Sequence, residues 1–103
     1  MNLSNMMKQV QQIQEKMARA QEELGGKTVQ AEAGGGMVTV EANGKQEIIS
    51  VKISPEAVEL SDIPMLEDLI TSAANEALRS SKTLLQKELS KITGGVQIPG
   101  INM

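Results

Sequence analysis

The chain has 103 residues and a net charge of −3, and it contains no cysteine, histidine, phenylalanine, tyrosine or tryptophan. That length suits one domain with a modest core, which here lacks the large aromatic side chains that dominate most cores. Without cysteine and histidine there are no disulfides, no zinc sites of the usual kind and no histidine-dependent catalysis. We therefore expect no cofactor, metal or small-molecule substrate, and we expect a thinly stabilised chain to associate with itself.

Charge is distributed unevenly along the chain. Residues 1–20 carry three bases and one acid, residues 21–76 carry three bases and eleven acids, and residues 77–103 carry four bases and one acid. Both ends are therefore basic and the middle is acidic, which the total conceals. The first ten residues lack the apolar core of a secretion signal, and no stretch approaches a membrane-spanning length. We expect a cytoplasmic chain with no membrane partner.

The first predicted element is a long amphipathic helix, capped by Asn2 or Ser4 and ended by Gly25 and Gly26. Its apolar residues recur at alternating steps of three and four, the heptad spacing of a helix that packs along another helix. This heptad seam consists of Leu3, Met6, Val10, Ile13, Met17, Ala20 and Leu24.

Three antiparallel strands are predicted in the middle of the chain, the first over residues 27–33 and the others in a hairpin over residues 37–53. Asn43-Gly44 predicts a two-residue type I′ turn, because both turn positions need a positive φ. Such a turn places Val38 opposite Ile49 and directs the β-branched residues of both strands to one face. The flanking helices would have to cover that face.

A short helical turn is predicted after the hairpin, with Ser54 as its N-cap and Pro55 as its first residue. A longer helix begins near Asp62 and stops at Gly94-Gly95. About 30 residues make a rod of roughly 45 Å, which is too long to lie wholly on a three-stranded sheet. We therefore expect the C-terminal part of this helix to project or to pack against another element.

Two glycine-containing stretches partly resemble phosphate-binding loops. Residues 26–28 end like a Walker A motif, but its first glycine would fall at Gln21, and the lysine follows a helix instead of a strand. The triple glycine at residues 34–36 lacks the spacing of a dinucleotide-binding loop and opens no helix. Both stretches predict turns, so no nucleotide cofactor is expected.

Several short sequence motifs follow one another along essentially the whole chain. They are MMKQVQQIQEKM at 6–17, QEEL at 21–24, AGGGMVTV at 33–40, NG at 43–44, VKISP at 51–55, MLEDL at 65–69, TGG at 93–95 and PG at 99–100. Together these motifs resemble the YbaB/EbfC family of bacterial nucleoid-associated proteins. At Ser54 many members carry Asp, and serine keeps the capping role.

This resemblance implies an α+β homodimer shaped like tweezers, in which the two sheets associate and the long helices project as arms. It also implies binding of duplex DNA with little sequence preference, in the nucleoid of a bacterial cytoplasm, with an influence on chromosome organisation or gene expression. We expect residues 1–95 to form one such domain and residues 96–103 to form a mobile tail.

Bases on the two long helices are the candidates for contact with DNA. With no aromatic platform for single strands and no helix-turn-helix or zinc finger, contact with duplex phosphates is the mode that remains. Each of these bases is also compatible with a plain solvated helix face. The candidates are Lys8, Lys16, Arg19, Arg79, Lys82, Lys87 and Lys91.

A second set of residues is expected in the core or between two copies. It comprises Met6, Val10, Ile13, Met17, Val38, Val40, Ile49, Val51, Ile53, Leu66 and Ile70.

An alternative function is a dimeric scaffold whose heptad seams recruit partner helices, with any DNA association incidental. An enzyme is not expected. The paired acids Glu22-Glu23 and Glu67-Asp68 are neighbours on helices, so the members of each pair point apart instead of converging on a substrate.

Overall fold

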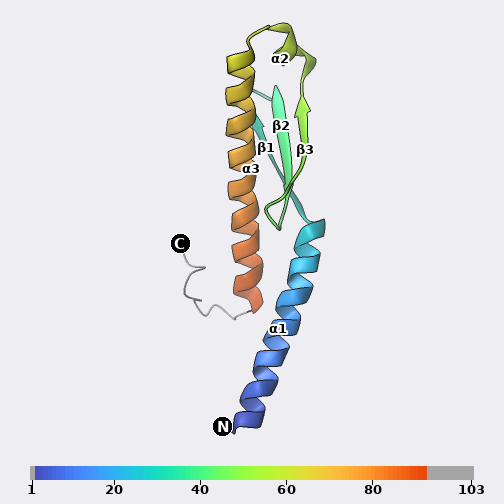
Figure 1. Cartoon of the computed structure of the whole chain (residues 1–103), viewed down its shortest axis with the longest axis vertical. Coiled ribbons are helices and arrows are strands. Elements are labelled where there is room, and N and C mark those ends of the chain that lie inside the picture. Colours follow the sequence, from blue (N-terminus) through green and yellow to red (C-terminus); the bar gives the residue numbers. More distant parts are fainter. Residues whose placement is uncertain (1, 93–103) are drawn as a thin grey trace.

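The computed structural model describes residues 2–92, and it confirms the predicted α+β order of elements (Figure 1). Three antiparallel strands form one sheet in the order β1-β2-β3. The predicted end of the last helix at Gly94-Gly95 and the predicted tail lie outside these residues. The elements are α1 (Leu3–Gly26), β1 (Thr28–Ala33), β2 (Val38–Asn43), β3 (Ile48–Ile53), α2 (Pro55–Glu59) and α3 (Ile63–Ile92).

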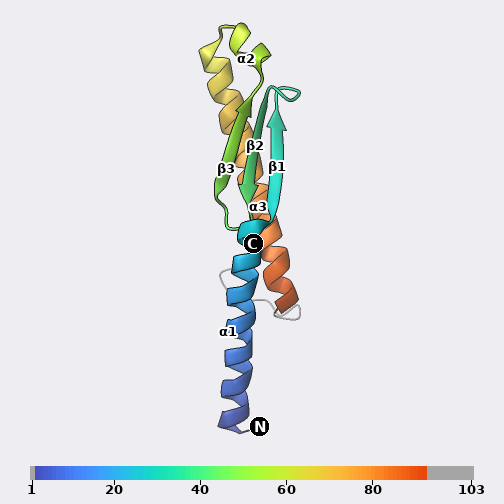
Figure 2. The ribbon, with the colours of Figure 1, turned by 90° about the vertical axis from the view of Figure 1, so that its right-hand side faces the viewer.

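The core lies between α3 and one face of the sheet. Figures 1 and 2 show α3 running along the sheet and then beyond it, beside α1. Alanines on the inner side of α3 let the helix approach the strands closely, while the outer residues of β1 are polar and exposed. The buried cluster consists of Ala31, Val38, Val40, Ala42, Ala73 and Ala77, with Leu66 and Ile70 half-buried against it.

Strand β3 is the uncovered part of this layer. Val51 pairs with Val40 and Ile53 pairs with Val38, so each pair points to the same face of the sheet. Val40 and Val38 are fully buried, whereas Val51 and Ile53 keep 44% and 40% of their surface exposed. The difference arises because α3 lies mainly over β1 and β2.

The hairpin between β2 and β3 differs from the sequence prediction. The prediction of a two-residue type I′ turn at Asn43-Gly44 is wrong, because four residues, 44–47, separate the strands. Val38 consequently faces Ile53 and not Ile49. A bulge shifts the register between Glu41 and Ala42, and it leaves Ile49 as the extra residue on β3.

The side chain of Asn43 explains the longer turn. Its carboxamide oxygen accepts hydrogen bonds from the backbone N–H groups of Lys45 and Glu47, at 2.9 and 3.1 Å. Such side-chain bonds build a local turn of their own, which competes with the predicted geometry. The positive φ falls at Gln46, at 64°, and not at Gly44.

Gly44 instead provides the joint between the hairpin and α1. Its N–H donates to the backbone oxygen of Leu24 at 2.8 Å, and Leu24 is fully buried. Close by, the buried hydroxyl of Ser81 in α3 donates to the backbone oxygen of Asn43 at 2.5 Å. This joint ties α1, the hairpin and α3 together at one end of the sheet.

Beyond the joint, α1 continues as a projecting rod (Figure 1). Asn2 caps it, because its side chain accepts a hydrogen bond from the Asn5 N–H at 2.8 Å; of the two predicted caps, Asn2 is therefore the one used. The residues toward the joint pack against α3, where Leu89 is also buried. The molecule consequently measures 68 × 24 × 16 Å.

Candidate nucleic-acid interface

The three candidate bases of α1 are all exposed. Lys8 and Arg19 are eleven residues apart, close to three helical turns, so they lie on the face opposite the heptad seam. Lys16 lies on the flank between this face and α3, where it lines a cleft. The bases of α1 therefore lie between Lys8 and Arg19, and Glu22 and Glu23 follow them toward the joint.

The four candidate bases of α3 all lie in its second half. Ser81 marks the end of the sheet through its bond to Asn43, so the helix beyond it runs beside α1. Arg79 forms an ion pair with Glu76 at 2.7 Å, and Lys91 forms one with Glu88 at 3.4 Å. The remaining two are Lys82, which is half-buried, and Lys87, which is exposed.

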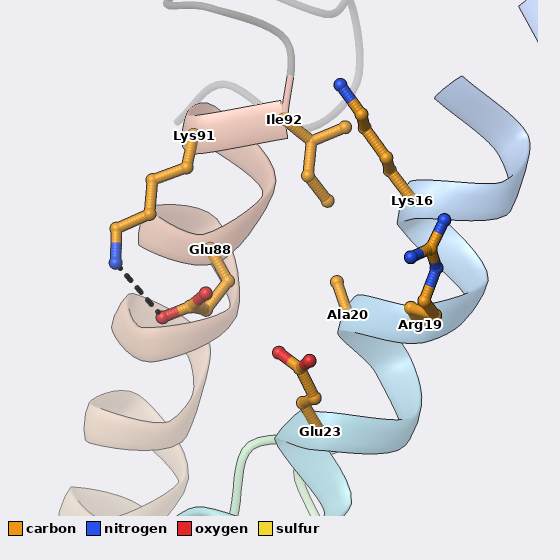
Figure 3. Close-up of a pocket in the computed structure, with 7 residues that line it drawn as sticks. All are labelled: Lys16, Arg19, Ala20, Glu23, Glu88, Lys91 and Ile92. Carbon is orange, nitrogen blue, oxygen red and sulfur yellow. Dashed lines mark hydrogen bonds and ion pairs between the residues drawn. The ribbon is translucent and has the colours of Figure 1, made fainter. Parts of the chain in front are cut away.

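Helices α1 and α3 enclose a shallow cleft of about 220 Å³ near their basic ends (Figure 3). The cleft brings together Lys16, Arg19 and Lys91 from the candidate set, with two carboxylates between them. Figure 3 shows Lys91 turned toward Glu88 and away from α1. The cleft between the two helices is thus lined by side chains of both charges, three basic and two acidic.

Glu88 is the most constrained carboxylate in this region. It accepts a hydrogen bond from the Lys27 ammonium at 2.9 Å and pairs with Lys91 as well. The hydrogen bond from Lys27, together with the charges of Lys27 and Lys91, lowers the pKa of Glu88 from its ordinary value, against a smaller opposing effect of burial. Lys27 is the C-cap residue of α1, directly before β1, so this pair fastens the end of α3 to the joint.

The Glu88 pair predicts a pH-dependent contribution to stability. Because the pKa is lower in the folded chain, the contribution is complete above the ordinary glutamate pKa and is lost as pH falls through the folded value. In urea titrations followed by far-UV circular dichroism, Glu88→Gln should lower the unfolding midpoint at pH 7, and the difference from wild type should shrink toward pH 3. The control is Glu22→Gln, an exposed site on α1. An equal difference at both pH values would contradict the prediction.

Lys27 is a basic residue of this region that the sequence reasoning did not select. It is separated from Glu88 by 61 positions, and no helical or strand periodicity relates the two. Only the packing of α1 and β1 against α3 brings them together. The one sequence signal for this pair is the presence of opposite charges near the end of α1 and near the end of the last helix.

The set expected in the core or between copies divides according to what α3 covers. Val38 and Val40 are buried, and Met17, Leu66 and Ile70 are half-buried. The others stay exposed because α3 reaches neither the N-terminal half of α1 nor most of β3. These exposed residues are Met6, Val10, Ile13, Ile49, Val51 and Ile53.

Membrane-spanning helices and acidic metal sites are both absent from residues 2–92. Within that part of the chain, no helix combines the length and the apolar character needed to cross a bilayer. The same residues contain no cluster of three or more acidic side chains placed to hold a metal ion.

Comparisons with known proteins agree with this fold. A family model for the YbaB/EbfC DNA-binding family matches residues 1–96. A nucleoid-associated protein of Desulforamulus reducens is 56% identical over 100 residues, which cover 97% of this chain and 95% of the relative. A nucleoid-associated protein of Pelotomaculum thermopropionicum is 50% identical with the same coverage.

A solved structure shares the architecture. The crystal structure of the uncharacterized protein HP0035 from Helicobacter pylori matches with a TM-score of 0.79 and 22% identity, over 92% of this chain and 99% of that one. Fold and comparisons thus define an elongated α+β protein of a DNA-binding class, not of an enzyme family. The chain belongs to the YbaB/EbfC DNA-binding family.

Proposed function

We propose that this chain is a nucleoid-associated protein that binds duplex DNA as a homodimer, through α1 and the second half of α3, with little sequence preference. The observation that carries the proposal is the gathering of bases at one end of an elongated molecule. Seven of the ten lysines and arginines lie on those two helix segments. Membership of a DNA-binding family supports the same conclusion.

The contact we propose is electrostatic and directed at phosphates. Lys8, Arg19 and Lys87 are exposed on the surfaces of α1 and α3. Lysine and arginine neutralise phosphates and release counterions whatever the base sequence, so such contacts position a protein without specifying a site. The chain offers no aromatic side chain on which unpaired bases could stack.

The acidic middle of the chain restricts where DNA can lie. Residues 21–76 hold eleven of the thirteen acids, and these residues include the whole sheet and α2. Their negative potential repels the phosphate backbone from the sheet. We therefore propose that duplex contact is confined to the helical arms.

The proposed homodimer forms where the sheet is uncovered. Strand β3 is an edge strand, and its apolar side chains Ile48, Ile49, Val51 and Ile53 are 40–50% exposed. An apolar edge with unpaired backbone groups is a template for another chain. Association of two sheets at β3 would bury this surface and leave both pairs of arms projecting.

The relatives named as nucleoid-associated proteins support the same cellular setting for this chain. We place it in the bacterial cytoplasm on the nucleoid, where a protein that covers DNA without strict sequence choice influences chromosome organisation or gene expression. The proposed role requires no enzymatic step and no cofactor.

The test is a comparison of several unrelated duplexes of equal length with a single strand of the same length, by fluorescence anisotropy of labelled DNA. We expect dissociation constants that agree within about threefold among the duplexes and weaker binding to the single strand. Tight binding to one duplex alone, or a preference for the single strand, would contradict the proposal. Light scattering on the same samples checks for the dimeric mass.

A further inference from the structure

The heptad seam of α1 is covered by its own chain over only half of its length. Toward the joint, Met17 is half-buried, and Ala20 and Leu24 are buried against α3 and the hairpin. Toward the N-terminus the seam is open, although its apolar spacing continues unchanged. The open seam residues and their exposed fractions are Leu3 72%, Met6 49%, Val10 54% and Ile13 41%.

The boundary between the two halves is the end of α3. Ile92 and Lys16 line the same cleft, so the last described turn of α3 lies level with Lys16 (Figure 3). Figure 1 shows no helix or strand beside the N-terminal part of α1. About three further helical turns of seam, residues 3–13, therefore have no partner within residues 2–92.

The open seam is complementary to itself. Its spacing of three, four and three reads the same in both directions, so an antiparallel second copy places Leu3 opposite Ile13 and Met6 opposite Val10. Within residues 3–14 the positions that flank the seam hold Met7, Gln9 and Gln14, so no like charges would meet there. The one base of this segment, Lys8, lies on the opposite face.

The end of α3 also decides the direction of pairing. A parallel copy lying on residues 3–13 would continue toward Ala20, where the C-terminal end of α3 already lies beside α1. An antiparallel copy ends at its own Leu3 near Ile13, and its remaining length runs away from the molecule. The α1 helix of the second copy would thus cover the part of the seam that α3 does not reach.

We propose that the N-terminal halves of α1 from two copies of this chain pair as a short antiparallel coiled coil. The pairing leaves Lys8 facing outward, so DNA contact and tip pairing use different faces of this part of α1. Two proposed homodimers joined in this way would hold two DNA segments together; this consequence alone rests on the proposed function. A contact of three turns is small, so the association should depend on concentration.

The absence of cysteine allows a direct cross-linking test. Full-length Met6→Cys and Val10→Cys chains that carry different tags are mixed without DNA and oxidised mildly. Antiparallel pairing predicts that the mixed disulfide exceeds both like-with-like disulfides. Gln12→Cys, on the opposite face of α1, is the control and should cross-link at the level of random collision. Like-with-like disulfides in excess, or yields no higher than the control, would overturn the proposal.

A second measurement separates self-association from other coverings of the seam. In sedimentation velocity without DNA, Val10→Glu should lose the concentration-dependent species beyond the basal one, and Gln12→Glu should retain it. Because Val10 is 54% exposed, the change should leave the fold intact, which circular dichroism checks. If the wild-type chain shows no such species, or shows it only after residues 93–103 are deleted, the seam is open or is covered by the chain's own tail, and the proposal is wrong. Neither readout involves DNA, so its failure is distinct from that of the proposed function.

Discussion

Replacement of Gly44 by alanine should lower the free energy of unfolding by about 2–3 kcal/mol, the upper part of the range for an overpacked interior. A Cβ at this position would lie 2.6 Å from Leu24 Cδ2 and 2.8 Å from the Leu24 backbone oxygen. The side chain of Leu24 is fully buried and cannot rotate freely, and its carbonyl is the acceptor for the Gly44 N–H. Relief of the clash therefore requires the end of α1 to move away from the hairpin.

Urea unfolding followed by far-UV circular dichroism measures this effect, since the chain has no aromatic reporter. The matched control is Gly26→Ala in the last turn of α1, where an added Cβ meets nothing within 4 Å. That change should leave stability unchanged or raise it by up to about 1 kcal/mol, because alanine favours helix. Equal losses in the two variants would mean that the Leu24–Gly44 contact does not set the joint.

Local patterning predicted the elements of this fold well. The heptad spacing located α1, the alternation in residues 27–33 and 37–53 located the strands, and Ser54-Pro55 located α2. These signals arise from neighbours in the sequence and from the periods of helices and strands. They are therefore available without knowledge of which elements pack together.

The turn of the hairpin could not be predicted in the same way. Asn43-Gly44 carries a strong local signal, yet Gly44 serves a close approach to Leu24, which lies 20 positions earlier and belongs to another element. The carboxamide of Asn43 meanwhile forms its own turn with Lys45 and Glu47. A non-local contact and a side-chain bond together override the backbone preference of the pair.

Which apolar side chains are buried was the second feature that could not be predicted from the sequence. Val38 and Val51 belong to equally regular alternations, but one is fully buried and the other is 44% exposed. The outcome depends on where α3 crosses the sheet and where it ends. For the candidate site, the sequence located the bases on two helices, whereas the pairing of Lys27 with Glu88 required the tertiary structure.

Reversal of charge at two arm lysines should weaken DNA binding for every duplex alike. Lys8 and Lys87 are exposed, and neither forms an ion pair within residues 2–92, so Lys8→Glu/Lys87→Glu removes positive charge without breaking an internal contact. We expect affinity to fall about tenfold or more at moderate salt, because phosphate contacts are lost and repulsion replaces them. The control, Lys45→Glu/Lys52→Glu, makes the same charge change at exposed positions on the hairpin. Light scattering confirms that both variants keep the wild-type mass.

The most direct measurement is the salt dependence of duplex binding by the wild type and these two variants. Each lost phosphate contact should reduce the slope of log K against log salt by about 0.9, so the arm variant of a dimer should lose about 2 to 4 from the slope. The hairpin variant should keep the wild-type slope. If the hairpin variant lost as much slope as the arm variant, or if the wild-type slope were near zero, DNA would not be held by the basic helical arms.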